Sequence, residues 1–152
     1  MENLAGFELF EIKPQMVSKG KKSQRLARTD LIGASVQVAA EGGETNMHSH
    51  PHTDSIWIVL DGEATFYGAG PGGNDKVAAN VKKNQGLLLK RGTPYWFESS
   101  GTTPLVILHL TARDPNAKSE NSRVNFRPRT RVGSEGAVVI EGKYFGEGKG
   151  GL

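Results

Sequence analysis

The sequence lacks cysteine entirely, which excludes disulfide bonds, cysteine-ligated zinc and a thiol nucleophile. It also lacks any apolar run near the roughly 20 residues that a membrane span requires. Its start, MENLAGFELFEI, has neither the basic region nor the long apolar core of a signal peptide. We therefore expect a cytoplasmic protein that does not bind membranes.

An excess of one charge is also missing, because the net charge of the 152 residues is only +3. A chain of this length fits one domain with one active or binding site. The basic stretch NSRVNFRPRTRVG contains a single aromatic residue, Phe126. Since nucleic-acid surfaces usually place aromatic residues among their cations, we expect no nucleic-acid partner and interpret this tail as solvated surface.

Helical periodicity is absent, whereas short apolar segments recur between turn signals that use many of the 20 glycines. Their β-branched and aromatic residues suit a pleated sheet. A sheet with one apolar face must close on itself or stack on another, so the pattern predicts an all-β sandwich or barrel. The expected strands lie within residues 7–12, 35–40, 56–62, 64–68, 86–90, 95–99, 104–112 and 136–142.

The same pattern divides the chain into three parts. Residues 1–29 are expected to form an N-terminal strand or arm, residues 30–112 the barrel, and residues 113–152 a polar extension. Within these parts, residues 68–83 are interpreted as a flexible loop and residues 137–145 as a candidate edge strand. The open edges of a small barrel need cover, so we expect a homodimer in which the terminal segments pair with an edge.

Three of the four histidines stand two residues apart, at His48, His50 and His52. Side chains two residues apart on a strand point to the same face, so His48 and His50 can project toward one spot. Imidazole nitrogen is a good ligand for Fe, Mn, Ni, Zn or Cu. His52 follows Pro51 near a turn, where it is either a surface residue or a further member of the pocket.

This stretch resembles the first sequence motif of the cupin family. Gly42 precedes His48 and His50 at the motif spacing, and Gly62 stands as its closing glycine. The motif's glutamate has two candidate replacements: Asp54, which keeps the carboxylate with a shorter reach, and Ser55, which does not keep the charge.

The second cupin motif has a weaker counterpart in NQGLLLKRGTPYWFESSG, residues 84–101. Tyr95 stands where the resemblance places the last histidine ligand, and could coordinate a metal, donate a proton or pack. His109, in the apolar segment PLVILHLTA, is either a hydrogen-bonded core residue or a replacement for that ligand. A one-residue slip in register would turn it to the other face.

The resemblance implies a single-domain cupin β-barrel of the double-stranded β-helix or jelly-roll type, dimeric as in many family members, with a site inside. The metal ligands would come from His48, His50, Asp54 and His109, with Tyr95 as a catalytic residue. Further pocket residues would be His52, Ser55, Trp57 and Phe97. Aromatic residues such as Trp57 and Phe97, where they face inward, would favour a small apolar or aromatic ligand.

Three functions are consistent with this sequence. The first is a metal-dependent enzyme of oxygenase, isomerase or lyase type that acts on a small organic molecule. The second is a metal-free isomerase or epimerase with a histidine as base and Tyr95 as acid. The third is a non-enzymatic module that binds or senses a small molecule.

Overall fold

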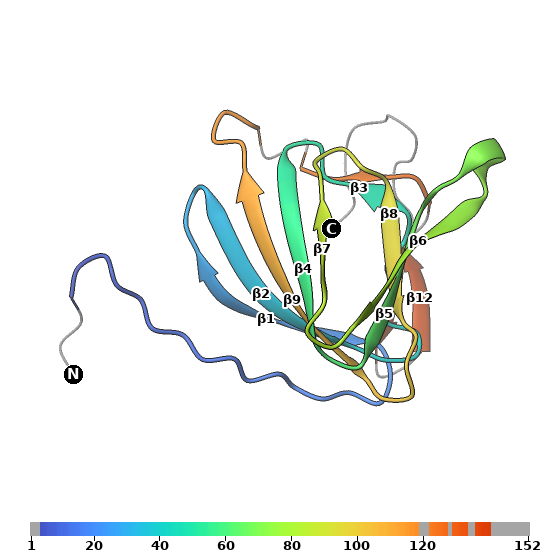
Figure 1. Ribbon diagram of the computed structural model, residues 1–152, viewed down its shortest axis with the longest axis horizontal. Helices are drawn as coiled ribbons and strands as arrows, with labels where there is room; N and C mark the ends of the chain where they lie inside the picture. Colours follow the sequence, from blue (N-terminus) through green and yellow to red (C-terminus); the bar gives the residue numbers. More distant parts are fainter. Residues whose placement is uncertain (1–3, 119–121, 128, 134–135, 141–152) are drawn as a thin grey trace.

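The computed structural model describes residues 4–118, 122–127, 129–133 and 136–140, and these form two five-stranded antiparallel sheets that face each other (Figure 1). The all-β class predicted from the sequence is confirmed. No helix in the described ranges is long and apolar enough to cross a membrane.

The first sheet has the strand order β1-β2-β9-β4-β7 and forms one wall of the barrel (Figure 1). Its strands are β1 (Lys21–Arg28), β2 (Ile32–Ala39), β4 (Thr53–Asp61), β7 (Gly86–Leu89) and β9 (Leu105–Arg113). The second sheet has the order β10-β3-β8-β5-β6. Its strands are β3 (His48–Ser49), β5 (Glu63–Ala69), β6 (Asp75–Lys82), β8 (Tyr95–Ser99) and β10 (Val124–Asn125).

An aromatic and aliphatic core fills the space between the sheets. Trp57 and Ile107 come from the first sheet, Phe66 and Phe97 from the second, and all four are at most 2% exposed. Alternate residues of each strand face this core, as the pleat requires. Burial of these large side chains therefore fixes which residues of every strand face inward and which face out.

Two elements correct the expectations from sequence. Residues 7–12 are not a strand but part of an extended, exposed arm, because no strand pairing joins them to another segment among the described residues. The segment 68–83 is not a flexible loop: after a single turn of 3-10 helix (Pro71–Gly73) it contains β6, which pairs with β5. The alternation in β6 is weak because most of its side chains are exposed.

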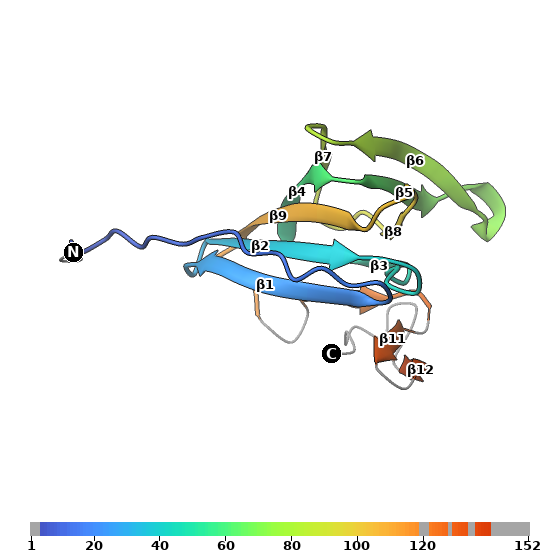
Figure 2. The same ribbon diagram turned by 90° about the horizontal axis from the view of Figure 1, so that it is seen from below.

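The two ends of the chain extend the barrel beyond residues 30–112. In Figure 2 the N-terminal arm runs along the first sheet before the chain turns into β1, the edge strand. After the barrel, β10 pairs with β3, and β11 (Arg129–Gly133) pairs with β12 (Gly136–Ile140) in a separate hairpin. Residues 141–145 of the expected edge strand lie outside the described part of the chain.

Candidate functional site

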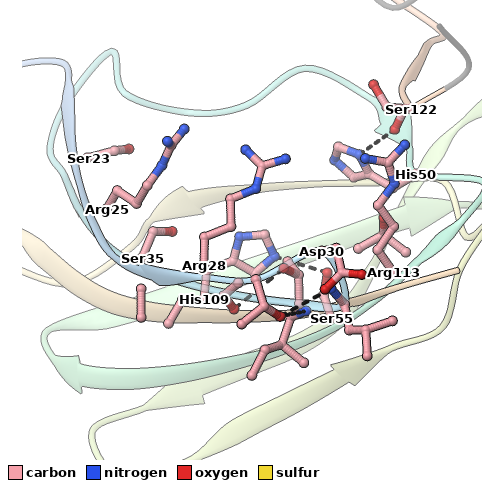
Figure 3. Close-up of a pocket in the computed structure, with 18 residues that line it drawn as sticks. Ser23, Arg25, Arg28, Asp30, Ser35, His50, Ser55, His109, Arg113 and Ser122 are labelled. Carbon is pink, nitrogen blue, oxygen red and sulfur yellow. Dashed lines mark hydrogen bonds between the residues drawn. The ribbon is translucent and has the colours of Figure 1, made fainter. Parts of the chain in front are cut away.

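An open cavity of about 590 Å³ lies on the inner face of the first sheet, at one end of the barrel (Figure 3). Its floor is built from strands β2, β4 and β9, and β1 forms one side. Ser122, in the segment after the barrel, contributes to the opposite side. The lining residues that carry polar or charged side chains are Ser23, Arg25, Arg28, Thr29, Asp30, Ser35, His50, Thr53, Ser55, His109, Thr111, Arg113 and Ser122.

The floor of the cavity follows from strand register. Ser35 of β2 lies opposite His109 of β9, and His109 lies opposite Trp57 of β4. One step toward the mouth, Thr111 lies between Gly33 and Ser55. Directly opposed residues in an antiparallel pair point to the same face, so these rows place small hydroxyl side chains around one imidazole.

His109 occupies the centre of this floor. Its ring stacks on Trp57 with centroids 3.6 Å apart, and its Nε2 lies 3.0 Å from Ser55 Oγ. Burial, together with the positive charges of His50 and Lys21, lowers the pKa of His109 to about 3. The imidazole is therefore neutral at pH 7 and can exchange hydrogen bonds with a ligand without adding charge.

His48 and His50 enter the site from the second sheet, through the short strand β3 and the turn after it. The two rings are perpendicular, with centroids 5.0 Å apart. Nδ1 of His48 donates to the carbonyl oxygen of Asn46 at 2.6 Å, and Nδ1 of His50 donates to that of Ser122 at 2.9 Å. Because the lowered pKa of His48 keeps its ring neutral, the proton on Nδ1 leaves the lone pair of this ring on Nε2.

The two histidines differ in access. His48 is 2% exposed, and burial together with the nearby charge of Arg123 holds its pKa well below the ordinary value. His50 is half-buried and lines the cavity, whereas His48 does not. A ligand in the cavity therefore meets His50 first.

Tyr95 lies directly opposite His48 on the neighbouring strand β8, with ring centroids 4.5 Å apart. It is 4% exposed and is not a lining residue of the cavity. Burial raises the pKa of its phenol far above the ordinary value, so the hydroxyl keeps its proton. A protonated phenol is a poor metal ligand but remains a proton donor.

The remaining candidates separate into inward and outward positions. Asp54 points away from the cavity, and its Oδ1 accepts a hydrogen bond from the backbone N–H of Arg91 at 2.8 Å. Its neighbour Ser55 faces inward, so only Ser55 of the two glutamate replacements reaches the site. His52 lies half-buried in the turn between β3 and β4 and does not line the cavity, and Phe97 belongs to the core.

The structure also brings residues to the cavity that the sequence pattern did not single out, namely Arg25, Arg28 and Arg113. The first two lie on the edge strand β1, whose sequence KKSQRLAR has no clear apolar alternation. The available signal was the concentration of arginine near the expected barrel ends. Strand pairing was needed to show which arginines face inward.

The described residues do not assemble a group of three or more histidine or carboxylate side chains that could hold a metal ion. His48 and His50 form a pair, Asp54 faces away, and His109 is bonded to Ser55. Protein metal centres of this kind generally use at least three side-chain ligands. Within the described part of the chain, the donor set for a resident metal is thus incomplete.

The family assignment follows from sequence as well as from this arrangement. The family model of the cupin domain matches residues 35–111, just over half of the chain. The chain therefore belongs to the cupin superfamily, as its first motif and its double-stranded β-helix fold indicate.

Sequence similarity to a curated relative extends over only part of the chain. Over 58 residues the chain is 38% identical to Uncharacterized protein YdbB from Bacillus subtilis (strain 168); the match spans 38% of this chain and 47% of YdbB. It thus spans about half the length of this curated relative.

Two solved structures illustrate the likeness of fold. A conserved protein with a double-stranded beta-helix domain from Klebsiella pneumoniae subsp. pneumoniae MGH 78578 has a TM-score of 0.62 at 22% identity, with 82% of this chain and 96% of that chain covered. An oxalate oxidase has a TM-score of 0.53 at 19% identity, with coverage of 64% and 53%. Identities this low show the fold alone.

Proposed function

We propose that the protein binds a small organic molecule in the open cavity, with His50 and His109 as its central polar contacts. The main observation in support is a single cavity of about 590 Å³. It is lined by strands β1, β2, β4 and β9, by the turn after β3 and by the segment at Ser122. Ligand pockets in proteins commonly measure about 300 to 1,000 Å³. The cavity is therefore large enough for a metabolite.

The chemistry of the floor supports binding by hydrogen bonds. Ser35, Ser55 and Thr111 offer hydroxyl groups that can donate or accept, and neutral His109 can do either, depending on its tautomer. The ring stack with Trp57 holds His109 in one orientation. A floor held in place before a ligand arrives reduces the entropy cost of binding.

A cavity-filling variant tests this proposal. Wild-type protein is screened by thermal shift against a panel of small acids, amides, sugars and aromatic compounds, and we expect at least one chemical class to raise the melting temperature. Ser35→Phe, which places a ring over the floor, should abolish that shift, whereas Ser100→Phe on an exposed turn should keep it. A panel without any stabilising compound, or an unchanged shift in Ser35→Phe, would contradict the proposal.

A metal site at His48 and His50 is the second candidate. The observation in its favour is that both Nδ1 atoms donate to backbone carbonyls, the arrangement by which proteins commonly orient histidine ligands. A divalent ion there would supply Lewis-acid or redox chemistry when bound. Because the described residues provide only this pair, no reaction step is assigned to it.

Elemental analysis of protein purified without chelators or a metal-affinity tag tests the second candidate. It predicts a retained Fe, Mn, Ni, Zn or Cu ion that is lost in the double variant His48→Ala, His50→Ala. The control His52→Ala removes an imidazole from the adjacent turn and should keep the ion. If wild-type protein binds none of these ions at micromolar concentration, the candidate is wrong.

The acid–base hypothesis is supported by the protonation states of His48 and Tyr95, but not by their accessibility to a ligand in the cavity. His48 is held neutral and Tyr95 protonated, which suits a base and an acid side by side. Neither lines the cavity, however, so a ligand there would not contact them without a rearrangement. This hypothesis therefore ranks behind the first two.

We also propose that the protein is a homodimer. The arm carries large apolar side chains that are exposed in the single chain, among them Phe7 at 74% and Leu9 at 94%. The outer face of the first sheet exposes Ile32, Ile56 and Leu88 as well. A second copy of the chain would cover both surfaces at once, with the arm of each copy on the sheet of the other.

A further inference from the structure

We propose that the ligand of this cavity is an organic dianion with two separated carboxylates, held by Arg25, Arg28 and Arg113. This inference rests on the proposed binding function and names the class of ligand. Three observations support it. Three arginines surround one cavity, they have no acidic partners among the described residues, and the floor beneath them offers neutral hydrogen-bonding groups.

A β-bulge places the first two arginines on one face. Arg25 lies opposite Ser35, and Arg28 lies opposite Gly33, with the register shift between Arg25 and Ala27. Residues three apart on a regular strand point to opposite faces, but the inserted residue restores the same face. Both side chains therefore reach into the cavity from the edge strand β1, as Figure 3 shows.

Arg113 supplies the other side of the cavity. It ends β9 opposite Thr53 of β4, and in Figure 3 its side chain lies beside His50. One of its N–H groups, on Nη2, donates to the carbonyl oxygen of Ala117 at 3.1 Å. That bond anchors the guanidinium while leaving further donors of its planar fork, which matches the two oxygens of a carboxylate.

The positive charge of the cavity is not neutralised by acidic residues of its own lining. Asp30 is the one acidic residue among its lining residues, against three arginines. The ion pairs of the described residues join Lys13 to Glu11 and Arg127 to Asp75, and none of these four residues lines the cavity. The guanidinium groups of Arg25 and Arg28 have no hydrogen bond or ion pair with any described residue.

The three arginines carry two more charges than Asp30 offsets, and a dianion would neutralise this excess. Because the arginines come from both sides of the cavity, two separate acidic groups fit better than one compact dianion. One carboxylate would lie at Arg25 and Arg28 and the other at Arg113, with the hydroxyl groups of the floor beneath the middle of the ligand.

Calorimetric titration with three probes tests the inference. Succinate carries two separated carboxylates, succinamide has nearly the same shape without charge, and inorganic phosphate is a compact dianion. We expect succinate to bind wild-type protein at least about tenfold more tightly than either other probe, because hydrogen bonds between ionised groups are stronger than those between neutral ones. Added salt should weaken succinate binding.

Matched variants locate the effect. The double variant Arg25→Met, Arg28→Met keeps most of the aliphatic length of both side chains and breaks no hydrogen bond or ion pair with the described residues, so it should fold normally and lose succinate affinity at least about tenfold. Arg113→Lys should weaken binding as well, since it keeps the charge but loses the fork. Arg91→Met, in the exposed turn before β8, should bind as wild type.

The outcomes separate this inference from the binding function. In one outcome, succinate fails to bind while a neutral compound of the panel binds to wild-type protein and not to Ser35→Phe. In that case the proposed class of ligand is wrong, but the proposed binding function of the cavity is retained. Equal affinity for succinate and succinamide, or an unchanged affinity in the double arginine variant, overturns the proposed class of ligand in the same way. Phosphate that binds as tightly as succinate overturns the two separated carboxylates. If no compound binds at all, both proposals fail.

Discussion

The imidazole of His109 lies flat on the indole of Trp57, with ring centroids 3.6 Å apart and planes 4° from parallel. The two residues are directly opposed on β9 and β4, so strand register alone brings the rings together. Ser55 Oγ, 3.0 Å from Nε2, fixes the edge of the imidazole. One face of the cavity floor is thus held by the apolar core beneath it.

This relationship predicts a loss of stability in acid. The pKa of His109 is lowered to about 3 by burial and by the charges of His50 and Lys21, whereas an unfolded histidine titrates near 6.5. Between these values the unfolded chain binds a proton that the folded chain does not, so the free energy of unfolding falls as the pH drops from about 6.5 toward 3. Each pKa unit corresponds to about 1.4 kcal/mol, which gives a loss of a few kcal/mol.

Urea unfolding at a series of pH values measures this slope. His109→Gln should lose part of it, although buried His48, whose pKa is also lowered, contributes a slope that remains. A His109→Gln profile that parallels the wild type between pH 6.5 and 4 would show that the ring is not held neutral.

Tyr95 predicts a contrast between two substitutions. Its hydroxyl makes no hydrogen bond with the described residues, while its ring contacts Trp57, Phe66 and His48. Tyr95→Phe should therefore change the free energy of unfolding by less than about 1 kcal/mol. Tyr95→Ala should cost about 3 to 5 kcal/mol, because it leaves a cavity in the core. Chemical denaturation distinguishes the two, and a large loss in Tyr95→Phe would reveal a partner for the hydroxyl.

Gly62, the closing glycine of the first motif, predicts a packing effect beyond its backbone angle. Its φ is +76°, and an added Cβ would lie 2.7 Å from the carbonyl oxygen of Pro104. Gly92 has nearly the same angle, +79°, but an added Cβ would meet nothing within 4 Å. Gly92→Ala should cost about 1 to 2 kcal/mol for the left-handed backbone alone. Gly62→Ala should cost more, since backbone must move; equal losses in thermal unfolding would refute the clash.

The arm predicts a change of oligomeric state. Removing residues 1–10 takes away Leu4, Phe7, Leu9 and Phe10 but keeps Val17, which packs against the buried cluster of Val36, Val38 and Val106. We expect the truncated protein to have a monomer mass by light scattering and the full chain a dimer mass. Val77→Ser, an exposed apolar residue on β6, should leave the dimer intact. A dimer without the arm, or a monomer with it, would remove the arm from the interface.

Much of the fold could be predicted from the sequence because burial imposes alternation. The strands β2, β4, β5, β8 and β9 are segments of alternating or continuous apolar character between turns, and each was expected within a few residues of its observed bounds. The strand β6 could not be predicted from an apolar pattern, because Val81 is its only buried side chain. The paired histidines of the first motif were expected to project together for the same reason of parity, and His48 and His50 do lie ring to ring.

Only the tertiary structure decided which polar residues share the cavity. Trp57 and Val59 must be buried, and this sets the parity of β4 that turns Ser55 inward and Asp54 outward. The bulge in β1 cannot be predicted from the local sequence, and it turns both Arg25 and Arg28 toward the cavity. Sequence determines alternation within a strand; the facing of a polar residue depends on register and bulges, which are fixed by pairing between segments far apart in the chain.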